Sequence, residues 1–201
     1  VRMRETEAIM ARPTTRHDTH STTSQSHGWS TKRIAVTALF CALMAISTLL
    51  IEIPLLPAVP WLKYDPSGVF GLVGGFAFGP ATGAVISIIP YLLHIATSSG
   101  VYGTIMAILA TFSLVVPASL IYKRVPTMWG ALLGMLVGAI VCLAACIAGN
   151  LIITPLYAHM TTEQVVALIV PALLPFNLLK VIINCALALL IYKPVSKALG
   201  N

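Results

Sequence analysis

The chain has 201 residues, of which 58% are hydrophobic and 9% are charged, and its mean hydropathy is +0.93. Soluble domains carry about 25% charged residues, so these values exclude a water-soluble globular protein. The net charge of +6 comes from basic residues that lie before and between apolar segments, which excludes the continuous basic face needed for nucleic-acid binding.

Residues 1–30 are polar and rich in Ser, Thr, His and Arg, with no apolar periodicity. This composition buries too little apolar surface to offset the entropy lost on ordering, so we expect a disordered cytoplasmic tail. A signal peptide is not predicted, because the apolar segment that follows is too long and lacks a convincing cleavage site. The remainder, 31–201, is predicted to be one membrane domain.

Six apolar segments follow the tail, separated by proline, glycine or charged residues. A helix needs about 20 apolar residues to span a bilayer, and five of the segments approach or exceed that length. The second segment is shorter and begins at Asp65-Pro66-Ser67, where proline suits the first turn and a side-chain oxygen can cap the helix. We predict an all-α integral membrane protein with a bundle of six transmembrane helices, at about 33–54, 65–80, 81–97, 102–122, 127–157 and 171–192.

Basic residues flank the predicted helices at alternate ends. They are Lys32, Arg33, Lys123, Arg124, Lys193 and Lys197. Since cytoplasmic loops are enriched in Lys and Arg, both termini are predicted to be cytoplasmic in a multi-pass protein of the cell membrane. The loops at 55–66, 97–102 and 158–170 then lie outside, where loops on a rigid scaffold can bind ligands.

Small residues recur every four positions in the second and fifth predicted helices, which allows close helix packing in lipid. They are Gly71, Gly75, Gly79, Gly130, Gly134 and Gly138. Ala38 and Ala42 form a similar patch on the first helix, which suits docking of another helix if it faces lipid. Cys142 and Cys146 share a helix face without a histidine or carboxylate at ligand spacing, and are interpreted as small buried residues.

Three polar residues stand out inside the predicted spans: Asn150, Asn177 and Lys180. Asn177 and Lys180 are three apart and share a face of the last helix, and Asn150 lies at similar depth, about 10 Å from the outer end of its helix at 1.5 Å per residue. Two amides and one cation suit a planar heterocycle, uncharged or weakly acidic, with several carbonyl and nitrogen positions. The alternative is that the asparagines tie helices together and Lys180 reaches the membrane surface.

The first outer loop carries further candidates for the pocket entrance: Glu52, Lys63, Tyr64 and Asp65. Asp65 is equally well interpreted as a helix cap. Trp61 and Tyr157 lie near helix ends, where aromatic residues usually anchor the membrane interface, although both rings could stack on a ligand.

Motifs for catalysis and nucleotide binding are missing from the sequence: it contains no Gly-x-x-x-x-Gly-Lys-Ser/Thr, Gly-x-Ser-x-Gly or His-Glu-x-x-His. We therefore predict that the chain is not an enzyme and has no cofactor of its own. Energy for any transport would come from ATP used by partner subunits.

Four stretches together resemble a known family: Leu62-Lys63-Tyr64-Asp65-Pro66-Ser67, Gly74-Gly75-Phe76-Ala77-Phe78-Gly79-Pro80, the stretch from Asn150 through Pro155-Leu156-Tyr157, and Leu174-Pro175-Phe176-Asn177-Leu178-Leu179-Lys180. They are similar to the riboflavin-specific S components, the substrate-binding subunits of energy-coupling factor (ECF) transporters. The resemblance covers about residues 31–195, and its most specific parts are the Lys-x-Asp of the first loop and the Pro-Phe-Asn block.

This resemblance implies a six-helix domain at 31–201 that binds a vitamin near the outer face and joins a transmembrane coupling (T) component and two ATPase subunits. It implies that Asn150, Asn177 and Lys180 hold the isoalloxazine ring, and that Ala38 and Ala42 contact the T component. The run Gly68-Val69-Phe70-Gly71 departs from the more branched run of the relatives. Another flavin, a folate or a different vitamin therefore stays open as the ligand, as does a non-transporting scaffold or pore subunit.

Overall fold

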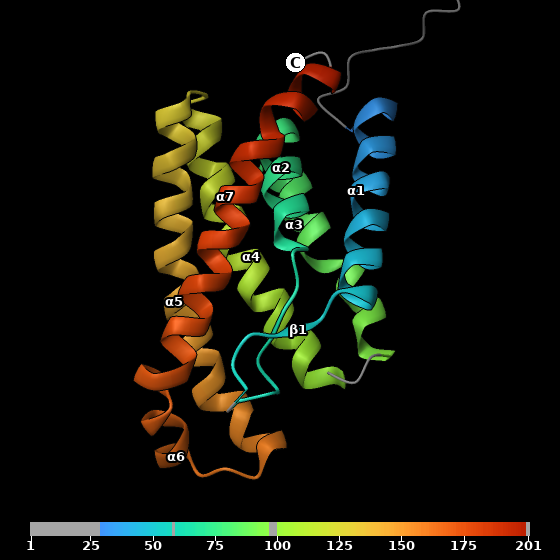
Figure 1. Cartoon of the computed structure of the whole chain (residues 1–201). Coiled ribbons are helices and arrows are strands. Elements are labelled where there is room, and N and C mark those ends of the chain that lie inside the picture. Colours follow the sequence, from blue (N-terminus) through green and yellow to red (C-terminus); the bar gives the residue numbers. More distant parts are fainter. Residues whose placement is uncertain (1–28, 58, 97–99, 200–201) are drawn as a thin grey trace, which may run out of the picture. The chain divides into compact units, whose positions relative to one another are not determined.

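The computed structural model describes residues 29–57, 59–96 and 100–199. The predicted tail at 1–30 therefore lies outside the described residues, apart from Trp29 and Ser30. The elements in chain order are α1 (Thr31–Leu50), β1 (Ile53–Pro54), β2 (Lys63–Tyr64), α2 (Gly68–Phe78), α3 (Pro80–Ile88), η1 (Pro90–Ala96), α4 (Gly100–Arg124), α5 (Met128–Ala158), α6 (Thr162–Ala167), η2 (Ile169–Leu173) and α7 (Leu174–Leu199). The long helices run alongside one another, and α6 lies at the end opposite the last turns of α7 (Figure 1).

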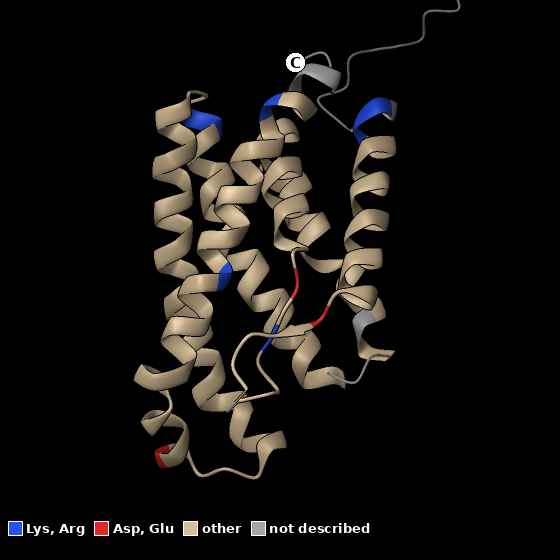
Figure 2. Cartoon of the chain, viewed as in Figure 1, with Lys and Arg blue, Asp and Glu red and all other residues tan. Residues whose placement is uncertain are grey.

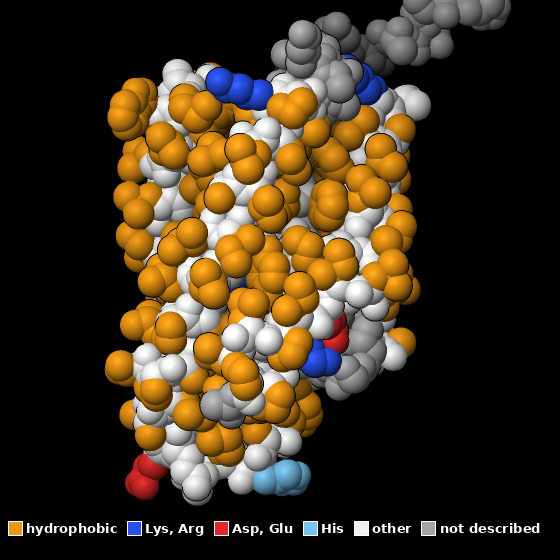
Figure 3. Space-filling view, viewed as in Figure 1, with side chains coloured by type: hydrophobic (Ala, Val, Ile, Leu, Met, Phe, Trp, Pro, Cys, Tyr) orange, Lys and Arg blue, Asp and Glu red, His pale blue; other side chains and the backbone are white. Residues whose placement is uncertain are grey.

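Four described helices are long and apolar enough to cross a membrane. They are α1, α4, α5 and the helical stretch Ile169–Val195, whereas Gly68–Phe78 and Pro80–Leu93 are apolar but shorter. Hydrophobic side chains cover most of the visible face of the bundle, as lipid contact requires (Figure 3). The all-α membrane fold is confirmed, and the predicted bounds of α4 and α5 agree with the structure within two residues.

Several predicted boundaries are wrong. The last helix continues to Leu199 rather than ending at residue 192, and a proline lies at each of three other boundaries. The first helix ends at Leu50 rather than at residue 54, because the chain turns into β1, which contains Pro54. The third helix ends at Ile88 and continues as a 3₁₀ helix from Pro90, which has no N–H for the α-helical ladder. The last helix is preceded by a π-helical turn, Ile169–Leu173, that contains Pro171.

The helices α4 and α5 pack closely because α5 presents glycine to the backbone of α4. A Cβ atom added at Gly134 would lie 2.6 Å from the carbonyl oxygen of Ala118, and one at Gly138 would meet the carbonyl oxygen of Leu114. Neither backbone group can move aside as a side chain would. The predicted role of these glycines in close helix packing is confirmed.

The segment between α1 and α2 is built as a small antiparallel pair, with Ile53 opposite Tyr64 and Pro54 opposite Lys63. Its apolar side chains form a second hydrophobic cluster with α6, η2 and the start of α7, separate from the main core of the bundle. The buried members of this cluster are Val59, Leu62, Tyr64, Val165, Ala172, Leu173 and Phe176. This packing holds the first loop against the helices that carry Asn150, Asn177 and Lys180.

Candidate ligand-binding site

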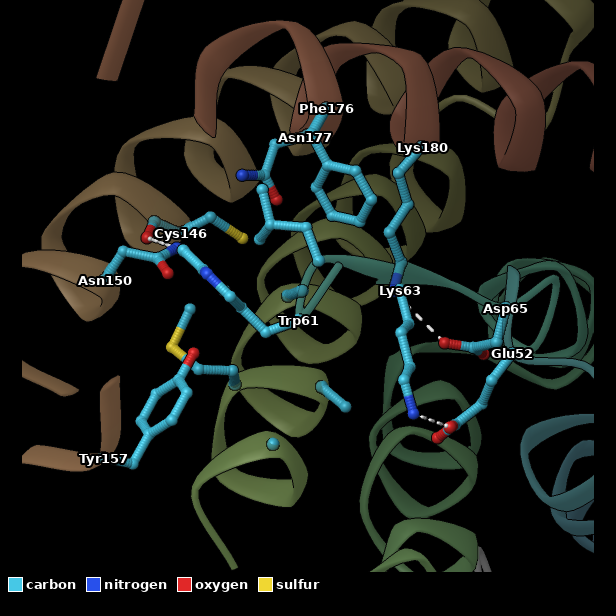
Figure 4. Close-up of a pocket in the computed structure, with 15 residues that line it drawn as sticks. Glu52, Trp61, Lys63, Asp65, Cys146, Asn150, Tyr157, Phe176, Asn177 and Lys180 are labelled. Atoms are coloured by element: carbon cyan, nitrogen blue, oxygen red, sulfur yellow. Dashed lines mark hydrogen bonds and ion pairs between the residues drawn. The ribbon is translucent and has the colours of Figure 1, made fainter. Parts of the chain in front are cut away.

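A cavity lies between the first loop and the helices α4, α5 and α7 (Figure 4). Its lining residues are Glu52, Trp61, Leu62, Lys63 and Asp65 from the first loop, Gly103, Met106, Ala107 and Ala110 from α4, Cys146, Asn150 and Tyr157 from α5, and Phe176, Asn177 and Lys180 from α7. The structure thus brings the predicted polar residues Asn150, Asn177 and Lys180 to one site.

The two asparagine side chains are anchored to their own helices. The Asn150 amide nitrogen donates to the carbonyl oxygen of Cys146 at 2.8 Å, and that of Asn177 donates to the carbonyl oxygen of Leu173 at 2.7 Å. Thr154 donates its hydroxyl hydrogen to the Asn150 side-chain oxygen at 2.9 Å. Since an amide has two N–H donors and two carbonyl lone pairs, each asparagine keeps hydrogen-bonding capacity for a ligand.

Lys180 does not reach for the membrane surface. Its side chain is buried, with 9% of the residue exposed, and its Nζ lies 3.2 Å from Oδ2 of Asp65, which is 6% exposed. An unpaired charge in an apolar interior is very unfavourable, so the carboxylate is what allows a lysine at this depth. Asp65 also accepts the backbone N–H of Ser67 at 3.0 Å, so it serves the start of α2 as well as Lys180.

A second ion pair closes the base of the first loop. Lys63 Nζ, on β2, lies 2.6 Å from a carboxylate oxygen of Glu52, which follows α1. The side chains of Lys63 and Glu52 are 28% and 17% exposed, so this pair is more accessible than that of Lys180 and Asp65. Together the charged residues that line the cavity are two acids and two bases, and both pairs are drawn as dashed contacts in Figure 4.

Aromatic rings form the apolar part of the cavity. Trp61 and Tyr157 meet edge to face, with ring centroids 6.2 Å apart, and Tyr102 stacks on Tyr157 with ring centroids 5.7 Å apart. Phe176 adds a third ring to the lining. A planar ligand could therefore contact aromatic faces while its edge meets the polar residues.

Tyr64 does not line the cavity, as far as the structure describes it. Its hydroxyl donates to the side-chain oxygen of Asn184, on α7, at 3.2 Å. Burial, and to a lesser degree the negative charge of Asp65, raise the pKa of Tyr64, so its hydroxyl stays protonated and can donate. Tyr64 thus joins the first loop to α7 instead of facing the cavity.

Ala38 and Ala42 are not among the described residues that line the cavity, and both are on the exposed face of α1. This patch therefore faces away from the bundle, which is the condition under which it would suit docking of another helix. Cys142 and Cys146 are buried, as predicted, with 3.8 Å between their sulfur atoms. Among the described residues, no group of three or more His, Cys, Asp or Glu side chains could hold a metal ion.

Sequence reasoning missed the wall contributed by α4, which includes Met106, Ala107 and Ala110. Nothing distinguishes these residues in the sequence, because an apolar side chain that faces a cavity has the same composition as one that faces lipid. It also missed Tyr91 and Asn184, two buried polar residues in predicted spans. Their polarity was an available signal, since polar groups are rare in such segments.

The chain resembles proteins of one family in sequence and in fold. A family model described as ECF transporter, substrate-specific component, matches residues 32–192. The chain is 28% identical over 176 residues to a protein named riboflavin transporter RibU from Staphylococcus aureus (strain TCH60), and the match covers 84% of this chain and 92% of that protein.

A solved structure has the same fold. It is described as the S component of a bacterial ECF transporter and superposes with a TM-score of 0.73, at 24% sequence identity, over 85% of this chain and 98% of that one. Together with the apolar helices, the family match identifies a membrane protein with several spans. The chain belongs to the substrate-specific (S) components of ECF transporters.

Proposed function

We propose that this S component captures riboflavin at the outer face of the cell membrane and delivers it across the bilayer with an ATPase module. The observation that carries the proposal is the meeting of Asn150, Asn177 and the ion-paired Lys180 at the edge of an aromatic-lined cavity. The relative from Staphylococcus aureus is named as a riboflavin transporter, which supports the choice of ligand.

The chemistry of the cavity suits an isoalloxazine ring. One edge of that ring alternates carbonyl oxygens with nitrogen positions, and amides can both donate to and accept from such an edge, while the ammonium donates to a carbonyl. The ring faces are apolar and planar, which matches Trp61, Tyr157 and Phe176. The two closed ion pairs leave the lining without net charge, which favours an uncharged ligand.

The proposed topology has six spans, with α2 and the α3–η1 stretch as two short ones, and both termini in the cytoplasm. The basic residues at the ends of α1, α4 and α7 gather at one end of the bundle in Figure 2, and basic residues favour the cytoplasmic side. The cavity and α6 then lie toward the outside. A cysteine-accessibility scan of α6 and of the α4–α5 connection tests this orientation.

The proposed partners are a T component and two ATPase subunits. The ATPase subunits, and not this chain, would use the ATP. The exposed face of α1 around Ala38 and Ala42 is the proposed contact with the T component, because small residues let a second helix approach closely. Ala38→Leu combined with Ala42→Leu should reduce co-purification of the T component and leave ligand binding unchanged.

Riboflavin binding by the purified protein tests the proposal directly. We expect quenching of flavin fluorescence with one ligand per chain, and a higher thermal unfolding temperature in its presence, because a ligand that binds only the folded state stabilises it. A folded protein that does not quench riboflavin, but is stabilised by a folate or another vitamin in the same thermal assay, would overturn the choice of ligand and keep the family.

A further inference from the structure

A chain of buried hydroxyl groups runs from the interior of the bundle to the carboxylate of Asp65. The Tyr91 hydroxyl lies 2.6 Å from the Ser67 hydroxyl and 2.9 Å from that of Thr111, and Ser67 in turn contacts Oδ1 of Asp65. Tyr91, at 0% exposed, comes from η1, Thr111 from α4, and Ser67 from the turn before α2. Three elements thus converge on one carboxylate.

The direction of these hydrogen bonds follows from the charge of Asp65. Its ion pair with Lys180 makes it a carboxylate, which can only accept hydrogen bonds. The Ser67 hydroxyl must therefore donate to Asp65, and its oxygen is left to accept the hydrogen of Tyr91. The oxygen of Tyr91 then accepts from Thr111, so all the hydroxyl hydrogens point toward the carboxylate.

This arrangement fixes how Asp65 presents its second oxygen. Oδ1 receives both the backbone N–H and the hydroxyl of Ser67, which prevents the carboxylate from rotating, and Oδ2 receives Lys180. An ammonium has three N–H donors, so the pair with Asp65 leaves two of them for other acceptors. The position of Oδ2 therefore sets the direction in which Lys180 offers its remaining donors to the cavity.

We propose that Tyr91 and Ser67 are positioning residues for ligand binding: they orient Asp65, and Asp65 orients the Lys180 ammonium toward a ligand carbonyl. The inference rests on the proposed function, in which Lys180 contacts the ligand. Tyr91 and Ser67 are not among the described residues that line the cavity, whereas Asp65 is, so the two hydroxyls act on the ligand through Asp65. Hydrogen bonds in a chain polarise one another, so loss of one hydroxyl weakens the other hydrogen bonds that lead to Asp65.

The test compares Tyr91→Phe in two backgrounds, by riboflavin titration of the purified full chain. In the native background we expect the affinity to fall by about three- to tenfold, the range for one hydrogen bond. In the background Asp65→Asn, Lys180→Met, which has no charge to orient, we expect Tyr91→Phe to change the affinity by less than about twofold. An equal loss in both backgrounds, or no loss in the native one, overturns the proposal.

Tyr122→Phe is the matched control, because it also removes a tyrosine hydroxyl whose hydrogen bond is short, 2.7 Å to the hydroxyl of Tyr192, but at the other end of the bundle. It should leave the affinity unchanged in both backgrounds. Ser67→Ala removes the next hydroxyl of the hydrogen-bond chain, the one between Tyr91 and Asp65. It replaces Tyr91→Phe in the test if Tyr91→Phe does not fold. Its affinity loss should match that of Tyr91→Phe, and the double variant should lose no more than either single one.

A second measurement needs no ligand. The rate at which a small amine-reactive reagent modifies Lys180, measured by mass spectrometry relative to Lys63, should rise severalfold in Tyr91→Phe and stay constant in Tyr122→Phe. An unchanged ratio of the two rates in Tyr91→Phe overturns the proposal even if the Asp65→Asn, Lys180→Met background binds no riboflavin. If the wild-type protein binds no riboflavin, the proposed function fails, and this ratio still decides whether Tyr91 orients Lys180.

Discussion

At the cavity end of the bundle, the Tyr91 hydroxyl belongs to a chain that ends on a carboxylate, whereas at the basic end Tyr122 and Tyr192 bond to each other beside Phe76. Both sets join helices that are distant in the sequence. At the cavity end the hydroxyls orient a charge that a ligand can use, and at the basic end they contribute to helix packing between α4 and α7. The same residue type thus serves binding in one region and stability in the other.

The charges differ between the two ends in the same way. Near the cavity, each base faces an acid, as in the pairs Lys180 with Asp65 and Lys63 with Glu52. At the basic end, Lys123, Arg124 and Lys193 are exposed, and the acidic residues that the structure describes lie elsewhere (Figure 2). Charges within the apolar layer need partners, whereas charges at the membrane surface are stabilised by water and lipid headgroups.

The largest effect is expected for Lys180→Met, which leaves the Asp65 carboxylate buried without its cation. Removal of one partner of a buried pair costs about 3–5 kcal/mol, so we expect a strong loss of thermal stability together with a large drop in riboflavin affinity. Chemical unfolding in detergent measures the first effect. Adding Asp65→Asn should restore much of the stability and little of the binding, and a double variant as unstable as the single one would contradict the pairing.

A smaller effect is expected for Asn177→Ala, which removes an amide from the cavity but no charge. Riboflavin affinity should fall by about 5- to 100-fold, because a buried ligand group that loses its hydrogen-bond partner costs about 1–3 kcal/mol. Fluorescence titration gives the affinity, and the unfolding temperature without ligand should change little. Equal losses of stability and affinity would favour the alternative in which the asparagine has only a structural role.

For Tyr122→Phe the comparison predicts a change in stability alone. Loss of its hydrogen bond to Tyr192 should lower the free energy of unfolding by about 0.5–1.5 kcal/mol, and riboflavin affinity should stay within experimental error. The measurement is a thermal unfolding curve beside a titration on the same preparation. A drop in affinity would show that the two ends are coupled.

The smallest effect is expected for Lys63→Gln, since the partly exposed pair with Glu52 contributes about 0–1 kcal/mol. The stability should hardly change, but release of riboflavin should become faster because this pair closes the base of the loop over the cavity. Stopped-flow dissociation measures the release rate at low and high salt. Glu52→Gln should give the same change. A release rate that is unaffected in both variants would show that this ion pair does not hold the loop closed over the cavity.

Part of the site could be predicted because polar residues are rare in this sequence. Asn150, Asn177 and Lys180 stand out against apolar neighbours, and helical spacing places the last two on one face. Asp65 was open to two interpretations, a helix cap and a residue at the pocket entrance, because a carboxylate before a helix looks the same in both cases. In the structure Asp65 accepts from the backbone N–H of Ser67 and lines the cavity, and its ion pair with Lys180 was not predicted.

The sequence by itself determined that this chain is a helical membrane protein and which polar residues lie within its spans, because hydropathy and 3.6-residue periodicity are local properties. Only the tertiary structure decided that Lys180 pairs with a residue 115 positions away, that α4 forms a cavity wall, and that Tyr91 supports Asp65 through Ser67. Such contacts depend on how helices are placed against one another, and a span that faces lipid on one side and a cavity on the other carries the same apolar composition on both.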